Sequence, residues 1–178
     1  DMIDNMNVKV PVKYTGLEIT RFYGFGNETV REDSLVEKDF YDVNQRYFGA
    51  GFNLNIPLDD NLEFRTGLLF EIATVLEKEN RLVTELDLYG MGTLDFLALT
   101  TQLSFDNRDD KELPFQGYYF NLYADAYPPT INNKDIFGKV TLDGRTYLSA
   151  KYITDFTLAL RAYGEIAWGE YPFYKGAS

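Results

Sequence analysis

The feature that most constrains this chain is an alternation of apolar and polar side chains with a period of two residues. Between residues 115 and 127, Tyr118, Phe120 and Leu122 fall on one face, and the residues between them are mainly polar. Period two is typical of a β-strand, because successive strand side chains point to opposite faces of a sheet. The pattern recurs in about seven segments, near residues 13–25, 47–56, 62–72, 97–106, 115–127, 136–148 and 156–168.

The connections between these segments alternate in length. Short turns near residues 56–64, 104–117 and 148–156 alternate with longer connections near residues 26–43, 75–93 and 127–136. Segment 82–89, "LVTELDLY", could be an eighth strand, but a spanning strand there would break the alternation, so we place it in a long outer loop. The sequence therefore predicts an all-β fold, an antiparallel up-and-down meander of about seven or eight strands.

Composition narrows the classes of function. The net charge of −11 disfavours nucleic acid as a partner, because phosphate binding needs a basic surface. The chain has no cysteine and no histidine, which removes thiol chemistry, the commonest general base and the commonest metal ligand. An enzyme is therefore not expected, and the sequence indicates no catalytic, cofactor-binding or metal-binding residues and no cofactor.

Alternation alone cannot say which face meets water. A soluble lipocalin-like barrel or sandwich that binds an apolar ligand would turn the apolar faces inward, whereas an outer-membrane barrel turns them toward lipid. Apolar faces free of charge over about ten residues suit a spanning strand, although Arg21 lies on the apolar face of the first segment. Aromatic residues gather near strand ends, where membrane girdles would lie: Phe105, Phe115, Tyr118, Tyr127, Trp168 and Tyr171.

A family resemblance supports the membrane alternative. The stretches "LSFDNRDDKELPFQGYYFNLYADAY", "FGKVTLDGRTYLS" and "LALRAYGEIAWGEYPFYKGAS" resemble the bacterial surface antigen superfamily, the BamA/TamA-like outer-membrane assembly and translocation barrels. The start, "GLEITRFYGFGNETVR", resembles barrels attached to calcineurin-like metallophosphoesterase domains. We therefore expect residues 1–12 to be a leader or linker. Residues 13–178 would be a partial transmembrane barrel, cut before the family's Arg-Gly-aromatic loop motif.

The resemblance also implies a location and partners. The protein would reside in the bacterial outer membrane, contact its lipid and handle unfolded outer-membrane polypeptides, with no covalent chemistry. Substrate strands would be templated at a barrel seam whose strands lie outside this chain, and the family's outer loop would dip into the lumen. The isolated chain would expose open sheet edges and an apolar face, so we expect it to self-associate.

Three polar motifs each have a plain structural interpretation. "DNRDD", residues 106–110, could offer carboxylates to a cation, but a strand-ending turn with Arg108 paired to a neighbouring carboxylate fits better. "GFGNET", residues 24–29, could suggest a phosphate cradle, yet no helix is expected to follow it, and Asn27 is formally a glycosylation site. Finally, Arg145, Arg161 and Glu165 fall on polar faces of adjacent strands and could form a lumenal ion-pair network.

Overall fold

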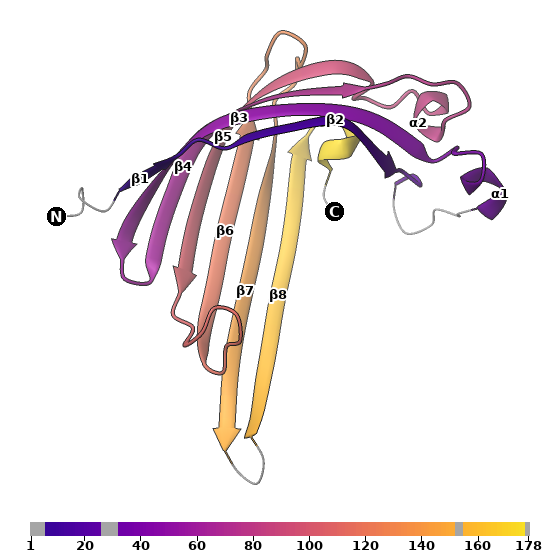
Figure 1. The fold of residues 1–178 in the computed structure, drawn as a ribbon. Helices are drawn as coiled ribbons and strands as arrows, with labels where there is room; N and C mark the ends of the chain where they lie inside the picture. The colour runs from indigo at the N-terminus through magenta and orange to yellow at the C-terminus, as the bar shows by residue number, and fades with distance from the viewer. Residues whose placement is uncertain (1–5, 26–31, 152–154, 177–178) are drawn as a thin grey trace.

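A computed structural model describes residues 6–25, 32–151 and 155–176 of the chain. These residues form one antiparallel sheet in which each strand pairs with the next, apart from β1 and β2, which both pair with β3. The predicted all-β meander is therefore confirmed (Figure 1). The strands are β1 Asn7–Lys9, β2 Val12–Arg21, β3 Asp42–Asp59, β4 Leu62–Val75, β5 Gly92–Asp106, β6 Gly117–Tyr127, β7 Phe137–Lys151 and β8 Asp155–Gly169.

β1 and β2 together behave as one interrupted edge strand. β1 pairs with residues 53–55 of β3, and β2 pairs with residues 42–50 of the same strand. The interruption falls at Pro11, which lacks an N–H but still accepts a hydrogen bond from the Gly51 N–H at 2.9 Å. Residues 7–9 thus belong to the sheet, although they lie within the stretch expected to be a leader or linker.

The connections at the two ends of the sheet differ in length, with one exception. At one end the connections from β3 to β4, β5 to β6 and β7 to β8 have two, ten and three residues, and at the other end those from β2 to β3, β4 to β5 and β6 to β7 have 20, 16 and nine (Figure 1). The predicted alternation therefore fails at the β5–β6 connection, which is one residue longer than the β6–β7 connection. The longer connections hold the short helices α1 (Asp33–Val36) and α2 (Leu82–Glu85), and the 3-10 helix η1 (Phe173–Lys175) follows β8 at the same end. Segment 82–89 is not a strand but contains α2, which confirms its assignment to a loop. None of the described helices is long and apolar enough to cross a membrane.

Successive strand pairs are staggered along the sheet. β4 and β5 pair up to Val75 and Gly92, whereas the pairing of β5 with β6 begins only at Leu99. At the opposite end, β7 and β8 pair down to residues 151 and 155, beyond the last pair of β6 with β7. Such stagger is what a sheet needs in order to close into a tilted barrel, and Figure 1 shows the sheet bending across its width.

Candidate lumenal site and lipid-facing surface

Burial on the two faces of the sheet is the inverse of that in a soluble barrel. Large apolar side chains on one face are about half exposed, among them Leu68 at 51%, Leu99 at 50% and Leu160 at 54%. Polar side chains on the other face are buried, among them Asn55 at 1% and Asp143 at 8% exposure. A soluble barrel buries its apolar residues inside, so here the polar face lines the interior and the apolar face points outward.

The exposed apolar face has the height of a hydrocarbon core. On β4 it runs from Leu62 to Ile72, a rise of about 33 Å along the strand, or about 25 Å after a tilt of ~40°. At the loop end the same face becomes polar: Thr74 on β4 lies beside Thr93 on β5, and their hydroxyls are 2.9 Å apart. Arg21, the charge that interrupts the first apolar pattern, lies at this loop end too and pairs with Asp42 at 3.2 Å.

Only part of the predicted aromatic girdle lies on the apolar face. Tyr118 and Trp168 are exposed on that face. Phe115 lies in the turn between β5 and β6, where its carbonyl accepts a hydrogen bond from lumen-facing Ser149, and the prediction for Tyr127 and Tyr171 is wrong. Tyr127 is 6% exposed and stacks on Phe137 with ring centroids 4.4 Å apart. Tyr127 falls on the same face of β6 as the lumenal residues Tyr123 and Asp125. The girdle prediction rested on its position near a strand end and ignored this alternation.

The lumenal face is not polar throughout, because an apolar cluster fills its loop end. The buried members are Ala73, Leu94, Phe96, Ala98, Tyr127 and Phe137, and Tyr171 and Tyr174 pack against them. The sequence signal for this cluster is the run of apolar residues on both faces within "LDFLAL", residues 94–99. A fully polar lumen, as expected from alternation, is therefore present only in the half nearer the short turns.

The segment after β8 folds back over this cluster. β8 ends at Gly169, whose φ of 82° lets the chain turn sharply. The Phe173 N–H then donates to the Tyr89 carbonyl in the β4–β5 loop at 3.0 Å. Pro172 packs against Gly90, where an added Cβ would lie 2.9 Å from the proline Cβ. The close approach of the two loops therefore depends on a glycine at position 90.

A buried ion pair fixes this segment to the wall. Lys175 Nζ donates to Glu71 Oε2 at 2.6 Å, and the Tyr47 hydroxyl donates to Glu71 Oε1 at 2.6 Å. The lysine ammonium also lies 5.3 Å from the ring centre of Phe96 and 4.9 Å from that of Tyr127, in the range of cation–π attraction. Sequence reasoning missed this site, since β4 and the segment after β8 are far apart in the chain.

Between the ion pair and the turn that joins β3 to β4, polar side chains form a row that crosses the strands. The Asn55 amide donates to Asn7 Oδ1 at 2.6 Å, and Arg65 donates to Asn55 Oδ1 at 2.5 Å and to Gln102 Oε1 at 3.1 Å. Gln102 in turn donates to Asn121 Oδ1 at 2.5 Å. The row ties β1, β3, β4, β5 and β6 together on the lumenal side.

Arg145 and Arg161 meet as predicted, but their shared partner is Asp143 rather than Glu165. Both guanidinium groups donate to both carboxylate oxygens of Asp143, at distances of 2.6 to 3.1 Å. Glu165 instead lies opposite Thr141, accepts its hydroxyl at 3.1 Å and pairs with Lys139 at 3.5 Å. The difference arises because Glu165 lies four residues along β8 from Arg161, about 13 Å at ~3.3 Å per residue.

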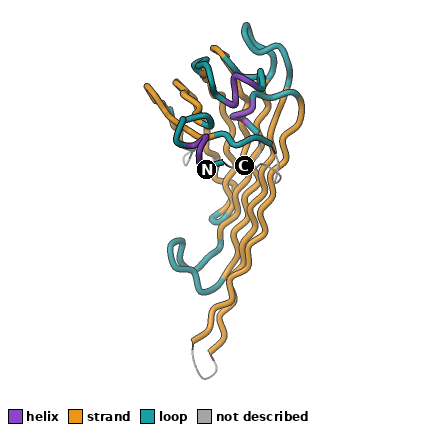
Figure 2. Tube along the Cα trace, turned by 90° about the vertical axis from the view of Figure 1, so that its right-hand side faces the viewer, coloured by secondary structure: helices purple, strands orange, loops and turns teal. Residues whose placement is uncertain are grey.

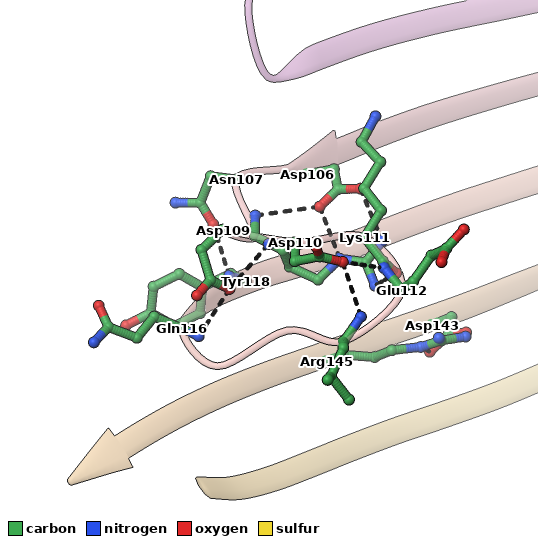
Figure 3. A network of polar contacts seen from close by, with 12 residues as sticks. Asp106, Asn107, Asp109, Asp110, Lys111, Glu112, Gln116, Tyr118, Asp143 and Arg145 are labelled. Atoms are coloured by element: carbon green, nitrogen blue, oxygen red, sulfur yellow. Dashed lines mark hydrogen bonds and ion pairs between the residues drawn. The ribbon is translucent and has the colours of Figure 1, made fainter. Parts of the chain in front are cut away.

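The aspartate-rich turn between β5 and β6 is held by its own side chains (Figure 3). Arg108 pairs with Asp106 through bonds of 2.8 and 2.9 Å, which is the predicted pairing with a neighbouring carboxylate. Asp109 Oδ1 accepts the N–H groups of residues 110, 115 and 116 at 2.9 to 3.0 Å. Asp110 Oδ1 accepts those of residues 112 and 113 at 2.7 and 2.9 Å.

These backbone donors lower the pKa of both the Asp109 and the Asp110 carboxyl groups below the ordinary value. The carboxylates act as internal caps of the turn, and no group of residues suited to hold a metal ion occurs in the described part of the chain. In the "GFGNET" motif, Gly24 adopts a φ of 112°. Residues 26–29 of the motif, including Asn27, lie outside the described residues.

One face of the sheet exposes an apolar band with the height of a hydrocarbon core, and the other face carries buried polar side chains with an apolar cluster at the loop end. This arrangement defines the wall of a transmembrane β-barrel. Residues 11–175 match the Omp85 superfamily domain, and the chain belongs to this superfamily of outer-membrane assembly and translocation proteins. No curated protein and no solved structure matches the chain. The bacterial outer membrane is therefore its location. Fusion to a phosphoesterase domain and the boundaries 1–12 and 13–178 stay predictions.

Proposed function

We propose that this chain forms part of the wall of a BamA/TamA-like barrel that assists the assembly or translocation of outer-membrane polypeptides. The observation that carries the proposal is the burial of the sheet, with its apolar face exposed and its polar face buried, which suits a protein that spans a lipid bilayer. Membership of the Omp85 superfamily supports the class of cargo. No covalent chemistry is required of the residues that line the lumen.

In this proposal the short turns face the periplasm and the loops with α1, α2 and η1 face outward. Outer-membrane barrels keep short periplasmic and long extracellular connections. In this sheet the two longest connections, of 20 and 16 residues, lie at one end, and the two shortest, of two and three residues, lie at the other. The turn between β5 and β6, whose backbone N–H groups are capped by Asp109 and Asp110, then lies at the periplasmic end of the barrel. The aromatic cluster and the Lys175–Glu71 pair lie in the outer half of the lumen.

We infer that this segment contributes a rigid part of the barrel wall. The polar row from Asn7 to Asn121 and the Asp143 cluster cross-link neighbouring strands inside the lumen, where burial strengthens hydrogen bonds. Strand exchange with a substrate requires an edge that opens, so the exchange would occur at seam strands outside this tightly linked part of the wall.

The isolated chain is expected to pair with itself. Within the described residues, β8 has no strand beyond it, and residues 155–169 present an uninterrupted edge. The opposite edge is blunted by Pro11 and by the irregularity between Thr15 and Glu18. Because unpaired, regular edges template further strands, association through β8 should exceed association through β2.

The proposal is tested by fractionating cells that express the complete protein and running the membrane extract on gels with and without boiling. An outer-membrane barrel should be found in that membrane and migrate differently when heated. Leu122→Arg, on the apolar face of β6, should reduce the heat-sensitive band, because a lipid-facing arginine costs about 2–4 kcal/mol. The neighbouring lumenal variant Asn121→Arg should reduce it less. A soluble protein without a heat shift would contradict the proposal.

A further inference from the structure

The loop between β6 and β7, residues 128–136, is attached to the start of β5. The Thr130 hydroxyl donates to the Asp95 carbonyl at 2.6 Å. The Asn132 backbone N–H donates to Asp95 Oδ1 at 3.2 Å, and the Asn132 side-chain amide donates to the same oxygen. Figure 1 shows this loop rising beyond the end of β6, and Figure 2 shows the helices and the longer loops gathered at this upper end of the sheet. Asp95 therefore fixes the loop to the wall.

Asp95 lies on the face of β5 that carries the exposed apolar side chains. Two and four residues further along the strand, Leu97 and Leu99 are 40% and 50% exposed, and side chains two residues apart share a face. The register agrees, because Asp95 pairs with Ile72, the last residue of the apolar run on β4. The carboxylate that holds the loop thus lies on the outer side of the wall, at the upper edge of the apolar band.

The attached turn, residues 130–133, is ordered by its own hydrogen bonds. The Thr130 N–H donates to the Asn133 carbonyl at 2.6 Å. Asn133 is fully buried and accepts the Tyr89 hydroxyl at 2.6 Å. Between these anchored residues Ile131 is 89% exposed, the highest value among the large apolar side chains of the described residues. An ordered turn that holds an isoleucine outward is typical of an interaction surface.

The position of Ile131 identifies what it contacts. Both of its neighbours but one in sequence terms, Thr130 and Asn132, are bonded to Asp95, and consecutive Cα atoms are only about 3.8 Å apart. Ile131 therefore lies next to the edge of the apolar band, and its surroundings continue those of that band. The two Asn132 donors also satisfy the Asp95 carboxylate, which lowers the cost of a charge beside lipid.

We propose that the β6–β7 loop is a membrane anchor. Asp95 holds the turn of residues 130–133 against the outer side of the wall, and Ile131 inserts between lipid chains just below the head groups of the nearer leaflet. The partner is the lipid of the membrane itself. The inference rests on the proposed function in one respect, namely that the apolar face of the sheet meets lipid.

The test uses the complete protein, without other cysteines, in phosphatidylcholine bilayers with a polarity-sensitive dye on Ile131→Cys. The dye should emit to the blue of its emission in water. Lipid with a spin label close to the head group should quench it more strongly than lipid labelled at the chain end. Leu97→Cys, two residues from Asp95 on the apolar face, is the lipid reference. Glu79→Cys, exposed in the β4–β5 loop, is the water reference and shows whether the dye enters lipid by itself.

Two variants test the role of Asp95. Asp95→Ala removes the acceptor of both Asn132 bonds, so the dye at position 131 should shift toward its emission in water. Asp95→Asn keeps an Oδ1 acceptor and should keep the dye in lipid. The heat shift of the barrel on gels, measured for both variants, confirms that the wall has formed. Unchanged blue emission in a folded Asp95→Ala variant would overturn the proposal.

The references separate failure of this inference from failure of the proposed function. Water-like emission at position 131 with lipid-like emission at position 97 would overturn the inference alone. A blue shift at position 131 that spin-labelled lipid does not quench would mean that protein covers Ile131, and would overturn it too. Water-like emission at both positions would contradict the proposed function and the inference with it.

Discussion

Lys175 and Glu71 lie 104 residues apart in the sequence, and their side chains are joined by a hydrogen-bonded ion pair of 2.6 Å inside the lumen. The pair is largely buried, with 17% of the lysine and 5% of the glutamate side chain exposed. It connects the segment after β8 to β4 across the interior of the sheet. The apolar cluster at the loop end of the lumenal face is thus covered by a segment that this ion pair and the Phe173 N–H to Tyr89 carbonyl bond hold in place.

Removal of one partner of this pair should be strongly destabilising. Glu71→Gln leaves the Lys175 ammonium buried without its counter-charge, which typically costs about 3–5 kcal/mol. The readout is the temperature at which the complete barrel loses its fast-migrating gel form. Glu63→Gln is the matched control, because its ion pair with Arg65 is more exposed, with 34% of the arginine and 42% of the glutamate side chain accessible. Its loss should therefore cost less, since exposed pairs are worth about 0–1 kcal/mol. Equal shifts for the two variants would contradict the role of the buried pair.

Loss of the Asp143 carboxylate should lower the free energy of unfolding more than loss of either arginine that it binds. Asp143→Asn leaves two guanidinium groups close together without their counter-charge, and we expect a loss of about 2 kcal/mol in the free energy of unfolding. Arg161→Gln should cost less than about 1 kcal/mol, since the Arg161 side chain is 55% exposed. Denaturant unfolding in detergent micelles measures both. A larger effect for Arg161→Gln than for Asp143→Asn would be inconsistent with the geometry.

The turn between β5 and β6 should loosen in acid. Backbone N–H donors lower the pKa of the Asp109 and Asp110 carboxyl groups in the folded protein. Their stabilisation is therefore present above the unfolded pKa of about 3.9 and is lost as the pH falls through the lower folded value. Hydrogen exchange of the N–H groups of residues 112, 113, 115 and 116, corrected for the intrinsic rate, should be slow at neutral pH and accelerate below about pH 4.

Asp109→Ala supplies the control for this pH dependence. It removes the acceptor for the N–H groups of Phe115 and Gln116, so exchange of these amides should be fast at neutral pH already. Protection that persists in the variant would show that other contacts order the turn.

Two glycines on the apolar face of β7 should respond differently to the same substitution. A Cβ at Gly138 would lie 2.4 Å from the Trp168 ring and 2.6 Å from the Asp125 carbonyl oxygen, whereas at Gly144 the nearest atom would be 3.9 Å away. Gly138→Ala should therefore lower stability by about 1–3 kcal/mol through overpacking and change the emission of Trp168, the only tryptophan in the sequence. Gly144→Ala should be close to neutral. Indistinguishable variants would contradict the packing of Trp168 on Gly138.

The sequence predicted the strands, their faces and the position of the loops. The two-residue period within a strand can be recognised without knowing how that strand is aligned with its neighbours. It predicted that Arg145 and Arg161 fall on polar faces of adjacent strands, but it could not predict which carboxylate they share. That depends on register, as when Asp143 rather than Glu165 receives Arg145 and Arg161. Register is fixed by the exact length and bulges of the connections, and a shift of four residues is invisible to alternation.

Contacts made by loops could not be predicted from the sequence either. Tyr127 was assigned to the girdle because it ends β6, but it is buried under residues that follow β8. The pairing of Lys175 with Glu71 has no local signal in either segment. The pairing of Arg108 with a neighbouring carboxylate could be predicted, because the residues involved lie within one turn.

The central claim, that the apolar face meets lipid, is tested most directly at two adjacent residues of β6. Leu122 lies opposite Leu103 and Leu142, whereas Tyr123 lies opposite Gln102 and Thr141. The sequence has no cysteine, so Leu122→Cys and Tyr123→Cys each add one to this segment for a fluorescent label in the complete protein, reconstituted in bilayers. We predict that spin-labelled lipid quenches the label at position 122 and not at position 123. Quenching at position 123 alone, or equally at both, would contradict the account.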